Sequence, residues 1–122
     1  MDSLTSLTTE ERPDGLKVVR IHGDLDSMGT QLIQDAFSRA ISDRTDTVIV
    51  DLSDVKFLSS SGMAMLLVKG KMLRQGGGNL ILAGPSERVL DVLRLSGFHE
   101  LFEIYPSVEE ALAALEKRQG KK

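Results

Sequence analysis

The amino-acid sequence predicts one α/β domain: a mixed β-sheet that opens with an N-terminal hairpin and has about four helices packed against it. Three observations support this fold class. Short runs rich in β-branched residues alternate with longer segments whose apolar residues recur every three or four positions. A turn signal, Pro13-Asp14-Gly15, joins the first two strand-like runs directly. The length of 122 residues suits a single domain with its own core.

The hairpin is predicted over residues 4–12 and 16–21. The first segment alternates weakly between apolar and polar residues, whereas the second, LKVVRI, is rich in β-branched side chains. A connection of three residues between two such runs is typical of antiparallel partners. We therefore expect the first strand to lie at an edge of the sheet.

A helix is predicted over residues 27–41, because apolar residues share one of its faces at a helical period. The residues that recur every four positions are Met28, Leu32, Ala36 and Ala40, and those that flank them are Ile33, Phe37 and Ile41. The next run, TVIVDL at residues 47–52, predicts a short strand that is buried on both faces.

Two further strand and helix segments follow. Residues 60–75 again show helical spacing, and three consecutive glycines at 76–78 end that helix. The run NLILA at residues 79–83 predicts a strand, and residues 85–95 predict a helix that stops at a Ser-Gly pair. Because strand–helix–strand units favour parallel neighbours, the sheet should be parallel beyond the hairpin and therefore mixed.

The C-terminal part is expected to contain a short strand at residues 101–104 and a last helix. Ser107 and Glu110 form a capping-box pattern that opens this helix. No internal repeat or long linker interrupts the chain, so residues 1–122 are predicted to be one domain. Its core spans about residues 4–116, and a short basic tail follows at 117–122.

The composition excludes several functional classes. The net charge is −3, and no clustered basic segment indicates binding to nucleic acid. The absence of cysteine excludes disulfides and a thiolate nucleophile, and two histidines are too few for a histidine-rich metal site. The apolar runs are too short to span a membrane, and the N-terminus lacks a signal pattern. We expect a cytoplasmic protein that needs no metal, cofactor, membrane or nucleic acid.

Catalytic signatures are missing from the sequence, and we expect neither enzyme activity nor catalytic residues. A hydrolase elbow, G-x-S-x-G, would need glycine where Leu58 stands, and no base accompanies a serine as an esterase would require. The pair Gly70-Lys71 lies within a predicted helix and is not followed by serine or threonine, as a phosphate-binding loop requires. The acidic pair in GDLD ends a strand, and we expect Asp24 to be solvated.

A row of three serines, Ser59, Ser60 and Ser61, lies where the second helix should begin. One serine at this place would cap backbone N–H groups of the helix. Two features favour a regulatory site instead: three hydroxyls exceed what a cap requires, and Gly62 leaves the backbone of the first turn open to a partner. A phosphoryl group here would also lie near the positive end of the helix dipole. Met63 suits core packing and partner contact equally well.

Three segments of the chain resemble the anti-sigma factor antagonist family, the STAS domains. They are GDLD at residues 23–26, VIVDLSDVKFLSSSGMAMLL at 48–67 and GGNLILAGPSERVLDVLRLSGF at 77–98, in the family's order and at its separations. The resemblance runs from about residue 16 to the last helix and implies a STAS-like fold. The chain is similar to the free-standing antagonists of bacterial partner-switching systems, without the membrane region of the family's sulfate transporters.

The resemblance also implies which residues form the functional site. The phosphoacceptor serine of the family falls on Ser60, whereas Ser59 stands where the family usually has aspartate and becomes an alternative acceptor. Asp26 matches the strand-end position that borders the acceptor, although it could equally be the N-cap of the first helix. The residues expected to contact a partner are Asp26, Ser59, Ser60, Ser61, Gly62 and Met63.

Partner switching is the function that the resemblance implies. The unmodified chain would bind an anti-sigma factor that is also a serine kinase and thereby free the sigma factor. Phosphorylation of Ser60 would block this binding, and a phosphatase would reset the switch. The alternative is a STAS scaffold module of a larger signalling complex, in which the serines only cap a helix. We expect a monomer, since no surplus apolar stripe remains once the core is assigned.

Overall fold

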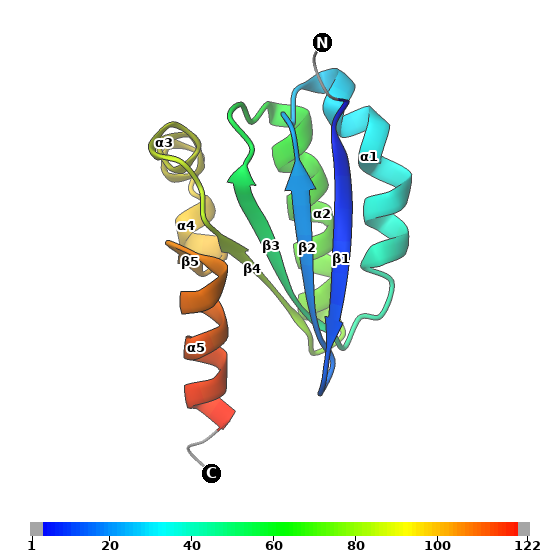
Figure 1. The fold of residues 1–122 in the computed structure, drawn as a ribbon, viewed down its shortest axis with the longest axis vertical. Coiled ribbons are helices and arrows are strands. Elements are labelled where there is room, and N and C mark those ends of the chain that lie inside the picture. The colour runs from blue at the N-terminus through cyan, green and yellow to red at the C-terminus, as the bar shows by residue number, and fades with distance from the viewer. Residues whose placement is uncertain (1–3, 120–122) are drawn as a thin grey trace.

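The backbone forms a five-stranded sheet in which the strands follow one another in space as they do in the sequence, in the order β1-β2-β3-β4-β5. A computed structural model describes residues 4–119 of the chain (Figure 1). The elements are β1 (Ser6–Arg12), β2 (Leu16–His22), α1 (Ser27–Ala40), β3 (Thr47–Asp54), α2 (Ser60–Gln75), β4 (Asn79–Ala83), α3 (Glu87–Leu95), α4 (Phe98–Leu101), β5 (Ile104–Tyr105) and α5 (Val108–Gln119).

The sheet is mixed, as the sequence predicts. β1 and β2 pair antiparallel along their whole length, and β1 lies at the edge. Their connection needs left-handed backbone at Asp14 (φ 66°) and Gly15 (φ 71°), a conformation that aspartate and glycine tolerate better than most residues. The remaining neighbours, β2 with β3, β3 with β4 and β4 with β5, are parallel. The predicted hairpin and the parallel crossovers are both confirmed.

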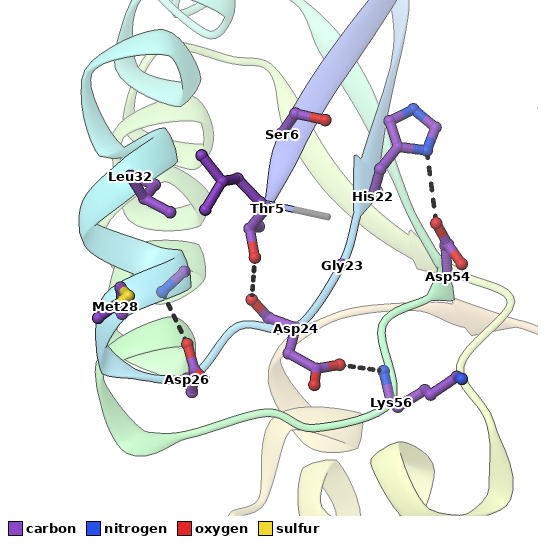
Figure 2. A pocket seen from close by; sticks show the side chains of 12 residues that line it. Thr5, Ser6, His22, Gly23, Asp24, Asp26, Met28, Leu32, Asp54 and Lys56 are labelled. Carbon is purple, nitrogen blue, oxygen red and sulfur yellow. Dashed lines mark hydrogen bonds and ion pairs between the residues drawn. The ribbon is translucent and has the colours of Figure 1, made fainter. Parts of the chain in front are cut away.

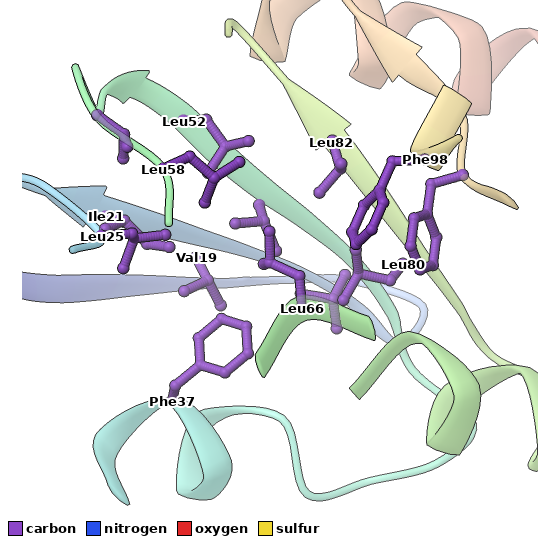
Figure 3. Close-up of a cluster of buried hydrophobic side chains, with 14 of the residues drawn as sticks. Val19, Ile21, Leu25, Phe37, Leu52, Leu58, Leu66, Leu80, Leu82 and Phe98 are labelled. Atoms are coloured by element: carbon purple, nitrogen blue, oxygen red, sulfur yellow. The ribbon is translucent and has the colours of Figure 1, made fainter. Parts of the chain in front are cut away.

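Helices cover both faces of the sheet. α1 and α2 pack against one face, and α5 packs against the other (Figure 1). On β3, Val48, Val50 and Leu52 belong to the larger core beneath α1 and α2, whereas Ile49 belongs to the smaller core beneath α5. All four side chains have no exposed surface, which confirms a strand buried on both faces. Figure 3 shows the larger core, where Phe37 of α1 lies opposite the strand residues.

The segment after α3 differs from the prediction. Residues 98–101 form the short helix α4, so the described chain contains five helices instead of about four, and the following strand is Ile104–Tyr105 instead of 101–104. Gly97, with φ 76°, turns the chain out of α3. A single helical turn then places Phe98 and Phe102 together, with ring centroids 5.6 Å apart and each residue 6% exposed. Burial of both rings therefore favours a helical turn where the apolar run had indicated a strand.

α1 faces the sheet differently from the predicted orientation. Its buried residues are Gly29, Thr30, Ile33 and Phe37. Met28 and Leu32, which were expected in the core, are 68% and 49% exposed. A monomer was expected because no apolar stripe would remain outside the core. The exposed side chains of Met28 and Leu32 contradict this reason.

The last helix, α5, begins at the predicted capping box and extends into the residues that were assigned to the basic tail. Ser107 caps its start, since its Oγ accepts a hydrogen bond from the backbone N–H of Glu110 at 3.1 Å. The helix continues through residues 117–119, and Arg118 forms an ion pair with Glu103, so these residues of the predicted tail belong to α5. The remaining tail residues, 120–122, lie outside the described part. Within residues 4–119, no helix is both long and apolar enough to cross a membrane.

Candidate functional site

The GDLD segment and the serine row lie side by side, because two loops at the same end of the sheet are joined through Leu25. The backbone N–H of Leu25 donates to the carbonyl of Phe57 at 2.9 Å, and the N–H of Ser59 donates to the carbonyl of Leu25 at 2.9 Å. Leu25 and Leu58 thereby form a short parallel bridge outside the main strands. Both leucines are buried, so the pairing anchors the loops between β2 and α1 and between β3 and α2.

Gly62 makes this pairing possible. A Cβ atom at this residue would lie 2.9 Å from the Cβ of Leu25 and 3.0 Å from the Leu25 carbonyl oxygen, closer than van der Waals contact permits. Gly62 is itself buried. The expectation that its missing side chain leaves the backbone open to a partner is therefore wrong: the space is filled by the neighbouring loop. Any part that Gly62 plays in partner binding acts through the shape of the loops.

Ser59 is the N-cap of α2, and its hydroxyl is fully engaged. Its Oγ accepts from the backbone N–H of Gly62 at 3.2 Å and donates to the carbonyl of Leu25 at 2.7 Å. The Oγ of Ser61 lies 2.9 Å from the Oγ of Ser59. Because the single hydroxyl proton of Ser59 is given to Leu25, Ser61 is the donor in this contact. The hydroxyl of Ser59 thus serves as the helix cap, and the hydroxyl of Ser61 is bound to that cap.

Ser60 differs from both neighbours. It is the first residue of α2 and is exposed. Within the described residues its hydroxyl makes no side-chain hydrogen bond, whereas Ser59 and Ser61 bond to each other. The row therefore presents one free hydroxyl at the positive end of a helix of 16 residues.

Asp26 caps α1 in the same way that Ser59 caps α2. Its Oδ1 accepts from the backbone N–H of Gly29 at 2.7 Å, and the side chain remains exposed next to the Leu25 bridge. Asp24 is not simply solvated, as had been expected, because its Oδ1 accepts from the backbone N–H of Lys56 at 3.1 Å. Both carboxylates therefore hold fixed positions at the end of the sheet that carries Ser60.

Two further residues at this end are Met63, for which two roles were expected, and Phe57, which the sequence reasoning missed. Met63 is half-buried and packs against the larger core, so packing is the role that the structure shows for it. Phe57, by contrast, is 52% exposed although it lies in the loop that leads to the serines. An aromatic residue between a strand end and a polar row was a signal that could have identified Phe57. The exposure of Met28 and Leu32 on α1 had no such signal.

A groove of about 770 Å³ lies beside the serine loop, between the start of β1, the first half of α1 and the loop after β3 (Figure 2). We call it the N-terminal groove. Its wall includes the side chains of His22, whose Nδ1 is 3.6 Å from Asp54 Oδ2, and of Asp24 and Asp26. The complete lining is Leu4, Thr5, Ser6, His22, Gly23, Asp24, Asp26, Met28, Gly29, Leu32, Asp54 and Lys56.

The chain is similar to several anti-sigma factor antagonists. An anti-sigma F factor antagonist of Paenibacillus polymyxa is 28% identical over 107 residues, which cover 87% of this chain and 92% of the relative. The unphosphorylated form of the anti-sigma factor antagonist SpoIIAA superimposes with a TM-score of 0.73 at 26% identity, over 92% of this chain and 97% of that one. The phosphorylated form of SpoIIAA from Bacillus gives a TM-score of 0.68, over 90% and 99%. Residues 8–111 match the STAS domain family, and the chain belongs to this family.

Proposed function

We propose that this chain is an anti-sigma factor antagonist. In its unphosphorylated form it binds an anti-sigma factor with serine kinase activity and frees the sigma factor, and phosphorylation of Ser60 blocks that binding. The observation that carries the proposal is Ser60 itself, an exposed residue at the start of α2 whose hydroxyl makes no side-chain hydrogen bond within residues 4–119. The relatives named above support the class of function, since they are anti-sigma factor antagonists.

Ser60 is a better acceptor than Ser59. Phosphorylation of Ser59 would sacrifice the hydroxyl proton that its Oγ donates to Leu25 and would disturb the cap of α2. Ser60 can accept a phosphoryl group without losing any side-chain hydrogen bond of the fold. The added group would also lie at a helix N-terminus, where a dianion is tolerated. The folded structure therefore need not change when the switch operates.

The switch would act on the docking surface itself. Phosphate adds about −1.5 to −2 charges and a bulky group to the surface around Ser60. A partner packed closely on this surface would have to desolvate the dianion, and a kinase must also bring the γ-phosphate of ATP to the same place. A loss of about 3 kcal/mol lowers affinity more than a hundredfold, which is enough to reverse a competition with a sigma factor. A phosphatase would restore binding.

The proposed contact residues divide into two groups. Asp26, Ser60 and Ser61 are exposed and can touch a partner directly. The others, Ser59, Gly62 and Met63, are half-buried or buried and hold the loops in shape. Since the kinase requires ATP and sigma factors act on RNA polymerase, we place this exchange in the cytoplasm.

Incubation with ATP and a cognate anti-sigma factor kinase tests the proposal, with peptide mass mapping of residues 59–61. We expect one phosphate, on Ser60, and at least a hundredfold weaker binding of the Ser60→Asp variant. Ser60→Ala is the matched control, because it should bind as the wild type does and accept no phosphate. Absence of phosphate throughout the row, together with unchanged binding of Ser60→Asp, would leave the scaffold module as the better account.

A further inference from the structure

We propose that the N-terminal groove is a second part of the docking surface and that it receives apolar side chains flanked by basic residues of the partner protein. The inference rests on the proposed function, because it assigns the chemistry of the partner at the same end of the molecule. It extends the surface around Ser60 and Asp26 to the start of β1, the first half of α1 and the loop after β3 (Figure 2).

The groove carries a cluster of exposed apolar side chains. Leu4 is 72% exposed, Met28 68% and Leu32 49%. Met28 and Leu32 lie one turn apart on α1, and both line the groove beside the start of β1 (Figure 2). Single exposed apolar residues are common, but several of them around one groove mark an interaction site. Because these side chains are half exposed or more and do not enclose a cavity, they suit a segment of a protein better than a small molecule.

The charges around the groove indicate a basic partner. Its lining holds three carboxylates, those of Asp24, Asp26 and Asp54, against one ammonium group, that of Lys56. Within residues 4–119 neither Asp24 nor Asp26 takes part in an ion pair, although each uses one oxygen to bind a backbone N–H. Their negative charge is thus fixed in position and still available. Complementary potentials favour association, so arginine or lysine side chains would fit this rim.

The groove is continuous with the surface around Ser60. Asp26 lines the groove and directly follows Leu25, whose carbonyl binds both the N–H and the hydroxyl of Ser59. One partner can therefore contact Ser60 and the groove at the same time. Phosphorylation of Ser60 does not alter the apolar side chains of α1, so the groove should contribute the same factor to the affinity of both forms.

Isothermal titration against the anti-sigma kinase described above tests this inference, at low and at high salt. The double variant Met28→Ser/Leu32→Ser should bind at least tenfold more weakly, because two apolar side chains are lost from a buried contact. The double variant Asp24→Asn/Asp26→Asn keeps both hydrogen-bond acceptors and removes only charge. It should bind about two- to tenfold more weakly at low salt and less so at high salt. Leu95→Ser is the control, since Leu95 is 90% exposed on α3 and its loss should change nothing.

Each outcome separates this inference from the proposed function. If the groove variants bind as the wild type does and Ser60→Asp still loses binding, the inference about the groove is overturned and the proposed function stands. Tighter binding of the Asp24→Asn/Asp26→Asn variant would show that the partner is acidic here and would also overturn it. Failure of the wild type to bind would overturn both proposals. A tenfold or greater loss on Met28→Ser/Leu32→Ser in both the wild-type and the Ser60→Asp background would support the groove, provided that thermal unfolding of all variants matches the wild type.

Discussion

The close contact between Gly62 and Leu25 can be tested by adding a single methyl group. In the Gly62→Ala variant the new Cβ would lie 2.9 Å from the Cβ of Leu25, 3.0 Å from its carbonyl oxygen and 3.0 Å from Cδ1 of Leu58. Two of these three atoms cannot move away without shifting the loop. The loops must then separate, which weakens the hydrogen bonds that join Leu25 to Phe57 and Ser59.

The expected change in the free energy of unfolding of Gly62→Ala is the sum of opposing contributions. Replacing glycine by alanine within a helix is worth up to about 1 kcal/mol in favour of folding. Overpacking a close contact costs about 1–3 kcal/mol, and each weakened hydrogen bond about 0.5–1.5 kcal/mol. We therefore expect Gly62→Ala to lower the free energy of unfolding by about 1–2 kcal/mol. It should also weaken partner binding, because Ser60 and Asp26 lie on the two loops that move apart.

Urea denaturation followed by circular dichroism measures the first effect, and titration with the anti-sigma kinase measures the second. Ala64→Gly is the matched control: it makes the reverse change on the exposed face of the same helix. It should lower stability by about 1 kcal/mol through helix propensity alone and leave binding unchanged. A Gly62→Ala variant more stable than the wild type would refute the reasoning, since it would show that the loops have room for the methyl group.

Three further predictions concern stability. Thr30→Val should stabilise the fold by about 1–2 kcal/mol in thermal unfolding, because the buried hydroxyl of Thr30 finds no hydrogen-bond partner within the described residues; a loss of stability would contradict this. Lys69→Met should cost about 1 kcal/mol in urea denaturation, since Nζ binds two carbonyls at the end of α1; exposed Lys71→Met should cost almost nothing. Hydrogen bonding from Arg118 lowers the pKa of Glu103 from 4.5, so this carboxylate should stabilise the fold above that pH and lose its contribution as the pH falls through the lowered pKa. The pH dependence should be absent in Glu103→Gln, and an unchanged acid profile in that variant would contradict the assignment.

Local patterns were sufficient where one segment determines its own environment. The β-branched run of β3 predicted a strand buried on both faces because three consecutive residues, Val48, Ile49 and Val50, are apolar and their side chains alternate between the two faces. α1 shows the limit of such reasoning. Its small residue Gly29 lies against the preceding loop, where a Cβ would be 2.0 Å from the carbonyl oxygen of Asp24. This close approach rotates the helix so that Met28 and Leu32 face outward, which a count of apolar residues cannot reveal.

The site shows the same division. The position of the serine row at a helix start and the capping by Asp26 depend on neighbouring residues and were predictable. The bridge through Leu25 joins residues more than thirty positions apart in the sequence. No periodicity reports such a contact, and so the structural role of Gly62 was missed. The free hydroxyl of Ser60 likewise became distinct only when the bonds of its two neighbours were known.

The first described residues lie beside the proposed docking surface, whereas the last helix runs away from it. Leu4 borders the groove beside the serine loop, whereas α5 descends toward the opposite end of the sheet (Figure 1). An affinity tag or fluorescent protein fused before β1 would therefore compete for the same space as an incoming partner. Fusions placed after α5 would leave that space clear, so measurements of partner exchange are best made with labels at the C-terminus.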